Sequence, residues 1–249
     1  PMTGGQTFSR RGFVAAAGAT VAAACARGVH VGAQPMGAPP TGTTVLFQGD
    51  SITDAGRGRD DATANSGGAL GTGYPLLLAA DLLEAYPDSG LRVFNRGVSG
   101  NKVPDLEARW EHDTLALAPE LLSVLIGVND YWHTRTFGYK GTVADYEQQY
   151  GSLLDATRQR LPRVRLVVME PFVLRTGVVD ATWLPDMDAR RAVAARVAAR
   201  AGATFVPLQT AFDDASARGG PAHWLSDGVH PTPAGHALIA ERWRALVGW

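Results

Sequence analysis

Cysteine is almost absent from this sequence: its 249 residues include only one, Cys25. A disulfide within the chain is therefore excluded, and because Cys25 lies ahead of the segments expected to fold, thiol chemistry is not expected either. An excess of charge of one sign is also missing, since the formal net charge is −1. The chain thus lacks the charge that favours binding to nucleic acid or to an anionic membrane.

Three other patterns are missing. The apolar run at residues 13–26 is shorter than the ~20 residues that span a bilayer. No G-x-G-x-x-G motif links the first predicted strand to its helix, which argues against a dinucleotide site. His223, His230 and His236 lack the surrounding ligands of a metal site. We therefore expect neither a metal ion nor an organic cofactor.

The amino-terminal region has the features of an export signal. Arg10 and Arg11 precede the mildly apolar run 13–26, as in bacterial twin-arginine signals. We predict an export signal at 1–33, a Gly/Pro-rich linker at 34–42 and one folded domain at 43–249, so the expected location is periplasmic or extracellular in a bacterium. Two alternatives stay open, namely lipoprotein-type cleavage ahead of Cys25 and an ordinary first helix of the domain.

Alternating short runs and helical patterns fill the predicted domain. Runs rich in apolar and β-branched residues predict strands at 44–48, 91–95, 121–126, 164–169 and 203–207. Helical spacing and end signals predict helices at 74–86, 103–117, 143–161, 185–201 and 233–249. This order predicts an α/β fold, a three-layer α/β/α sandwich with a five-stranded parallel sheet.

Four polar segments follow these strands or precede the last helix. They are 49–54 (GDSITD), 95–101 (NRGVSGN), 127–130 (GVND) and 227–231 (DGVHP). Ligands of parallel α/β sheets bind outside the carboxyl ends of the strands, so the first three segments should share one rim. The fourth lies in a loop that can fold back over it. Each segment alone is an ordinary turn or helix start, but together they supply the groups of a serine hydrolase.

Ser51, His230 and Asp227 are the predicted catalytic residues. A serine hydroxyl needs a base to remove its proton, and a neutral imidazole with a pKa near ~6.5 is suited to accept it. Asp227 lies three residues before His230, a spacing that lets a carboxylate hold one ring nitrogen while the other faces Ser51. Taken singly, Ser51 is equally a helix cap, and His230 and Asp227 are equally loop residues.

Negative charge forms on the carbonyl oxygen when an ester is attacked, and fixed donors must face that oxygen. The candidate donors are the backbone N–H groups of Ser51 and Gly100 and the side-chain amide of Asn129. Asp54 and Arg57, just after Ser51, are candidates to brace its turn. The alternative for these positions is a plain turn, a flexible loop or a solvated helix start.

These motifs resemble the four blocks of the SGNH (GDSL) hydrolases, carried here by Gly49-Asp50-Ser51, Gly100, Asn129 and His230. The resemblance covers nearly all of 43–249. It implies a flavodoxin-like fold, no cofactor, a Ser51–His230–Asp227 triad and an oxyanion hole of Ser51, Gly100 and Asn129. Further stretches, including 108–111 (ARWE) and 126–132, resemble the branch that contains bacterial acetylxylan esterases.

The resemblance implies a serine esterase that removes acetyl groups from acetylated xylan or xylo-oligosaccharides through an acetyl-serine. Candidate substrate-contacting residues, on the basis of their polar or aromatic side chains near the rim, are Asp50, Tyr74, Tyr131, Trp132 and Trp224. The alternatives are a lipase, arylesterase or thioesterase acting on longer acyl groups, and a non-catalytic carbohydrate-binding protein. The expected partner is an acetyl ester of a sugar, and a homo-oligomer is an open alternative to a monomer.

Overall fold

The computed structural model describes residues 37–249. The predicted export signal and the first part of the predicted linker lie outside these residues, and their assignment stays a prediction. The last linker residues contact the domain, since Gly42 N–H donates to the Ser89 carbonyl at 2.7 Å. Within the described part of the chain, no helix is long and apolar enough to cross a bilayer.

Five parallel strands form one sheet in the order β2-β1-β3-β4-β5. They are β1 (Thr44–Gly49), β2 (Arg92–Asn95), β3 (Leu121–Leu125), β4 (Arg165–Met169) and β5 (Thr204–Val206). All five predicted strands are present, each within one or two residues of its predicted bounds. The predicted α/β class and five-stranded parallel sheet are therefore confirmed.

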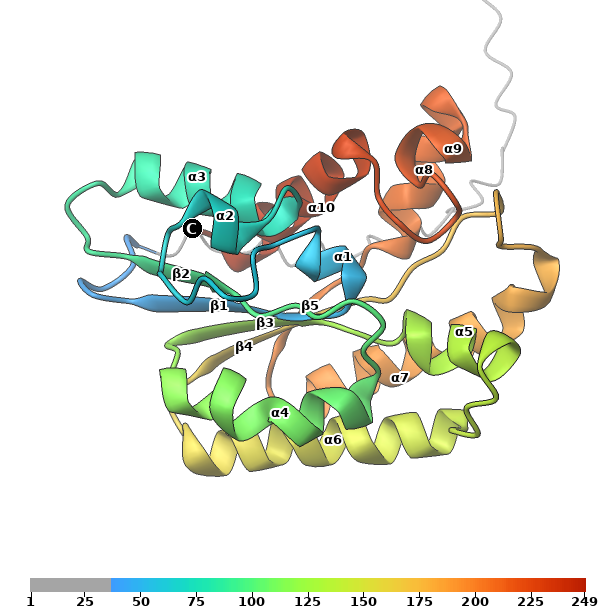
Figure 1. The fold of residues 1–249 in the computed structure, drawn as a ribbon, viewed down its shortest axis with the longest axis horizontal. Helices are drawn as coiled ribbons and strands as arrows, with labels where there is room; N and C mark the ends of the chain where they lie inside the picture. The colour runs from blue at the N-terminus through green and yellow to red at the C-terminus, as the bar shows by residue number, and fades with distance from the viewer. Residues whose placement is uncertain (1–36) are drawn as a thin grey trace, which may run out of the picture. The chain divides into compact units, whose positions relative to one another are not determined.

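Helices cover both faces of the sheet (Figure 1). The helices are α1 (Ser51–Asp54), α2 (Gly67–Leu70), α3 (Tyr74–Ala85), α4 (Val103–Asp113), α5 (Val128–Thr136), α6 (Val143–Arg160), α7 (Leu184–Arg200), α8 (Gln209–Gly219), α9 (Pro221–Trp224) and α10 (Pro233–Val247). Two 3₁₀ turns, η1 (Leu115–Leu117) and η2 (Ala181–Trp183), complete the described chain. Figure 1 shows α3 and α10 on one side of the sheet and α4, α6 and α7 on the other.

Two apolar cores result from the alternation of side chains along the strands. In β1, Val45 and Phe47 pack with α3 and α10, whereas Leu46 packs with α4 and α6. In β4, Val167 faces the first core and Val168 the second. Because both faces of each central strand are buried, these strands read as continuous apolar runs rather than alternating ones.

Some helix bounds differ from the predictions for local reasons. The helix expected to continue to residue 117 ends at Asp113, and η1 follows it before Ala118 turns into the left-handed region at φ 43°. The last helix ends at Val247, where Gly248 adopts φ 78° as its cap. Helix α5 was not predicted, because its sequence, VNDYWHTRT, has no apolar stripe at helical spacing.

Candidate active site

Ser51 and His230 meet at the carboxyl end of the sheet. The Ser51 Oγ lies 2.9 Å from His230 Nε2, although the two residues are 179 positions apart. Ser51 is placed there because β1 ends at Gly49 and α1 begins at once, with Asp50 as its cap accepting from the Ile52 N–H at 3.0 Å. This contact puts an imidazole nitrogen in position to take the hydroxyl proton.

Asp227 binds the other ring nitrogen of the same histidine. Its Oδ2 lies 2.7 Å from His230 Nδ1, and its Oδ1 accepts from the Val229 N–H at 2.9 Å and the His230 N–H at 2.8 Å. Burial alone would raise the pKa of Asp227, but the bonds donated by His230 and Val229 outweigh it and hold the pKa below 3.8. Asp227 is therefore a carboxylate at neutral pH, and it directs the imidazole proton to Nδ1.

The connection after β4 supports the Asp227 loop from behind. Val178 N–H donates to the Asp227 carbonyl at 3.0 Å, and Leu174 N–H donates to the Gly228 carbonyl at 2.9 Å. Gly177 has φ 56°, and a Cβ there would lie 2.5 Å from the Asp227 carbonyl oxygen. Only glycine permits this approach, so the backbone of one loop fixes the carboxylate of the other.

The three predicted oxyanion donors lie on the ends of three neighbouring strands. Gly100 follows β2 with φ 82°, and within residues 37–249 its N–H has no hydrogen-bond acceptor. Asn129 lies in the first turn of α5 after β3, and its Nδ2 donates to the Asn101 carbonyl at 3.2 Å. This bond orients the amide and leaves its second proton available. The arrangement can hold donors toward an oxygen above Ser51.

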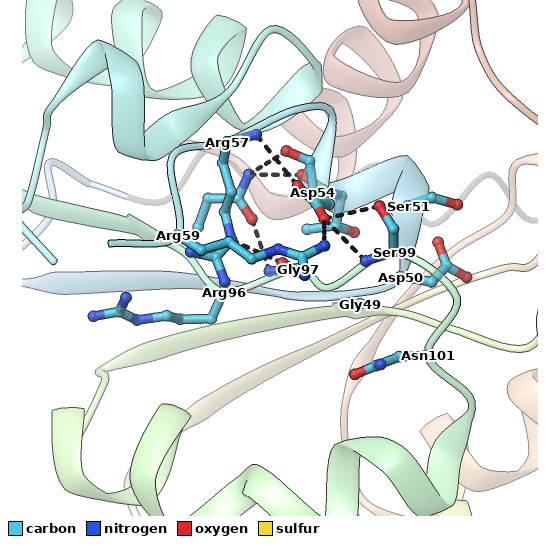
Figure 2. Close-up of polar contacts among 12 residues, drawn as sticks. Gly49, Asp50, Ser51, Asp54, Arg57, Arg59, Arg96, Gly97, Ser99 and Asn101 are labelled. Atoms are coloured by element: carbon cyan, nitrogen blue, oxygen red, sulfur yellow. Dashed lines mark hydrogen bonds and ion pairs between the residues drawn. The ribbon is translucent and has the colours of Figure 1, made fainter. Parts of the chain in front are cut away.

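Asp54 holds the loop that carries Gly100 (Figure 2). Its Oδ2 accepts from the Ser99 N–H at 2.9 Å and from the Ser99 hydroxyl at 2.8 Å, and Arg59 pairs with the same oxygen. Arg57 Nε donates to the Gly97 carbonyl at 2.7 Å. Asp54 and Arg57 are both buried. They were expected to brace the turn of Ser51, and the structure shows that they also bind the loop that carries Gly100.

Asn95 is a positioning residue that was not predicted. It begins the polar segment 95–101, but the sequence did not indicate which groups its side chain binds. Its amide donates to the Thr53 carbonyl at 2.6 Å and accepts from the Gly97 N–H at 2.9 Å. A Cβ on Gly97 would lie 2.3 Å from the Asp54 nitrogen. The loops after β1 and β2 are therefore packed backbone to backbone, with Asn95 bonded to both.

The structure places two of the predicted substrate-contacting residues in the interior. Tyr74 is fully buried, and its hydroxyl lies 2.9 Å from Thr53 Oγ1 while its ring packs edge-on against Phe47. Asp50 is 1% exposed, and it serves as the cap of α1. Both follow glycine at a helix start, which suggested the rim, but the fold directs their side chains inward.

The remaining aromatic candidates lie at different distances from the triad. The Trp132 ring is half-buried with its centroid 5.8 Å from that of His230. Tyr131 packs edge-on against Trp183, and its hydroxyl donates to the Thr182 carbonyl at 3.1 Å. Trp224 packs against His223 and lines a cavity of about 370 Å³ to which none of the triad residues contributes. Trp132 is thus the aromatic candidate whose ring packs beside that of His230.

Two buried acids lie beneath the site, in the turn before Ser51 and in the first turn of α5. Burial raises the pKa of Asp50 from 3.8 to about 7, and nearby Asp130 adds to this while Ile52 N–H and His230 oppose it. Burial likewise raises the pKa of Asp130 to about 6. Each carboxyl has one oxygen without a hydrogen-bond partner in the described chain. Asp50 thus holds a proton over much of the range below neutral pH.

The Asp50 carboxyl makes the stability of the protein depend on pH. The folded state retains a proton between about pH 4 and pH 7 that the unfolded state has lost, so the contribution of Asp50 to stability declines as pH rises through that window. The free energy of unfolding of Asp50→Asn minus that of the wild type is therefore expected to increase by roughly 1–3 kcal/mol as pH rises from 5 to 8. Urea unfolding at each pH measures this difference. The matched control is Asp155→Asn, which makes the same change at an exposed carboxylate. A difference for Asp50→Asn that does not change with pH would contradict the prediction.

No group of three or more histidine, cysteine or acidic side chains within residues 37–249 is arranged to hold a metal ion. The chemistry that the site offers is that of its side chains and backbone donors. The Ser51 hydroxyl, the His230 imidazole and the Asp227 carboxylate are joined by hydrogen bonds, and the three candidate N–H donors follow the ends of β1, β2 and β3. This arrangement is suited to acyl transfer through a tetrahedral intermediate.

Comparison with known proteins gives consistent matches. A model of the GDSL-like lipase/acylhydrolase family matches residues 47–238. An acetylxylan esterase from Geobacillus stearothermophilus is 36% identical over 211 residues, which are 84% of this chain and 95% of that protein. A solved GDSL-like lipase candidate from Parabacteroides merdae superposes with a TM-score of 0.82 at 44% identity, over 84% of this chain and 97% of the other. A solved acetylxylan esterase from G. stearothermophilus superposes with a TM-score of 0.77 at 34% identity, over 84% of this chain and 96% of the other.

Proposed function

Because this chain belongs to the GDSL-like lipase/acylhydrolase family and is a carboxylic ester hydrolase, we propose that it removes acetyl groups from carbohydrate, most specifically from acetylated xylan or xylo-oligosaccharides. The observation that carries the substrate assignment is the 36% identity to an acetylxylan esterase along 95% of that protein's length. The resemblance to this branch, first found in the motifs, is confirmed by the comparison. The half-buried Trp132 beside His230 supports a small acyl group, since its ring occupies space next to the base.

In the proposed reaction, Ser51 Oγ attacks the acetyl carbonyl carbon while His230 Nε2 takes the hydroxyl proton. The carbonyl oxygen becomes an oxyanion that accepts from the N–H groups of Ser51 and Gly100 and from the Asn129 amide. Asp227 stays ionised and stabilises the imidazolium. The bond to the sugar oxygen then breaks, and His230 gives its proton to that oxygen.

The second half of the reaction releases acetate. Water loses a proton to His230 Nε2 and attacks the acetyl-Ser51 carbonyl, and the same donors hold the second oxyanion. Collapse breaks the bond between the acetyl carbon and Ser51 Oγ, and His230 returns the proton to the serine. The products are acetic acid, which ionises, and the free sugar hydroxyl, so neither a cofactor nor a second substrate besides water is needed.

Acyl-chain length separates this proposal from its rival, an esterase for longer acyl groups. The rival has support in the 44% identity to a GDSL-like lipase candidate. We expect kcat/KM for p-nitrophenyl esters to fall at least about tenfold from acetyl to octanoyl, since the Trp132 ring beside His230 would restrict the space for longer chains. Acetate release from acetylated xylo-oligosaccharides, compared with acetylated cello- and manno-oligosaccharides, tests the sugar. Rates that rise with chain length would favour the rival.

A further inference from the structure

One guanidinium joins the two loops that carry Ser51 and Gly100. Arg109 Nε donates to Asn101 Oδ1 at 2.8 Å, and Arg109 Nη1 donates to the Arg96 carbonyl at 2.8 Å. Its Nη2 donates to the Gly49 carbonyl at 3.3 Å. Arg96 and Asn101 are the two ends of the loop with Gly100 between them, whereas Gly49 ends the strand that leads to Ser51.

The three acceptors come from two segments of the chain, and all of them bind the same guanidinium. Figure 2 labels the residues that carry them, Gly49, Arg96 and Asn101. A guanidinium has five N–H donors in a rigid plane, so its bonds fix the distances between the acceptors as well as their directions. The Arg109 side chain is only 18% exposed, which shields these bonds from competing water. Asn101 also provides the carbonyl that orients Asn129, so this contact reaches a second oxyanion donor.

We propose that Arg109 is a positioning residue of the oxyanion hole: it sets the Gly100 N–H and, through Asn101, the Asn129 amide at a fixed distance from Ser51. This inference rests on the proposed function, because it concerns the same oxyanion. Arg109 does not touch the reacting atoms. It acts through the loop, as the Asp54 carboxylate does through its bonds to Ser99.

The ordinary alternative is that Arg109 only stabilises its own helix. It pairs with Asp113 one turn later at 2.9 Å, but this pair lies within the helix and would not require the three bonds that Arg109 makes to the two loops. The helix also has other anchors. Gln48 Nε2 donates to the Asp113 carbonyl at 3.1 Å, and Asp130 Oδ1 accepts from the Val103 N–H at 3.2 Å. Helix α4 is thus attached at both ends without Arg109, so the domain should fold when this side chain is removed.

Arg109→Ala is expected to lower kcat for p-nitrophenyl acetate by about 10²-fold, because a donor displaced by even 1 Å loses most of its effect on the oxyanion. KM should change by less than about threefold, since the ground-state ester gains little from these donors. The inhibition constant of a boronic acid, which forms a tetrahedral adduct on a serine, should rise by a factor similar to the loss of kcat/KM. Arg109→Lys should recover only part of the loss, because an ammonium does not reproduce the planar fork.

Two controls separate positioning from a general loss of structure. Arg160→Ala removes a guanidinium that binds Glu111 on the exposed face of α4 at 3.0 Å, and it should keep wild-type kcat. Guanidinium chloride, well below denaturing concentration, should raise the rate of Arg109→Ala and leave that of Arg160→Ala unchanged. The pH profile of Arg109→Ala should keep the wild-type shape, since the His230–Asp227 contact is untouched.

The outcomes are distinguishable. A folded Arg109→Ala enzyme with wild-type kcat, a loss confined to KM, or unchanged boronic acid affinity would overturn the positioning role while leaving the esterase assignment intact. Absence of esterase activity in the wild type on every ester tested would overturn the proposed function instead. A loss of kcat and boronic acid affinity together, with guanidinium rescue, supports the inference.

Discussion

Ser51→Ala is expected to lower kcat for acetyl ester hydrolysis by about 10⁵–10⁶-fold, because the variant retains the donors and the base but has no atom to form the acyl-enzyme. The residual rate should come from water held near His230 and the oxyanion donors. Initial rates with p-nitrophenyl acetate, followed by acetate release from an acetylated xylo-oligosaccharide, measure the change.

The control for this variant is its fold. The Ser51 side chain contributes one hydrogen bond, to His230, and α1 keeps its cap through Asp50, so the melting temperature should stay within a few degrees of wild type. Ser152→Ala, on the exposed side of α6, removes a hydroxyl far from the site and should leave kcat unchanged. A Ser51→Ala rate within tenfold of wild type would rule out Ser51 as the nucleophile.

Asp227→Asn is expected to lower kcat by about 10³–10⁴-fold, mainly through the tautomer of His230. The Asn oxygen can still accept from the Val229 and His230 N–H groups, so the loop keeps its shape. Its NH₂ then faces Nδ1, however, and a donor at this position favours the imidazole proton on Nε2. In that state Nε2 no longer accepts from Ser51, and the base is lost without any displacement of the ring.

Measurement of kcat for Asp227→Asn between pH 6 and pH 9 checks this expectation, with Asp155→Asn as the matched change of charge at an exposed position of α6. NMR of the imidazole nitrogens provides an independent readout, since the proton should move from Nδ1 to Nε2. A loss smaller than tenfold, with the proton still on Nδ1, would show that the carboxylate does not set the tautomer.

The sheet was predictable because its strands are buried on both faces. In β3, for example, Leu121, Leu122, Val124 and Leu125 do not alternate with exposed polar residues. This composition is typical of a parallel sheet covered on both faces rather than of a sheet with one face in solvent. Helix α5 was missed because its stability comes from contacts rather than from an amphipathic pattern. Its aromatic residues pack against Trp183 from a distant loop, a contact that no local rule contains.

The site could be predicted only in part. The sequence order placed Ser51, Gly100 and Asn129 at strand ends, since each follows a run with a clear stop. It did not determine which way the neighbouring side chains point. Tyr74 and Asp50 were expected at the rim, but their side chains point into the interior. Contacts such as Arg109 to Gly49 depend on how two loops pack, which is a property of the assembled sheet.

The support of Asp227 by the connection after β4, through Gly177 and Val178, has a consequence for refolding experiments. Ser51, the proposed nucleophile, follows β1, whereas Asp227, which binds His230, is supported by the connection after β4, on the far side of β3. A species in which only half of the strands have docked has no hydrolytic turnover, whatever helix content it displays. The hydrolytic rate recovered during renaturation is therefore proportional to the number of fully folded molecules. The delay between recovery of the circular dichroism signal and recovery of activity would measure the time of the last docking step.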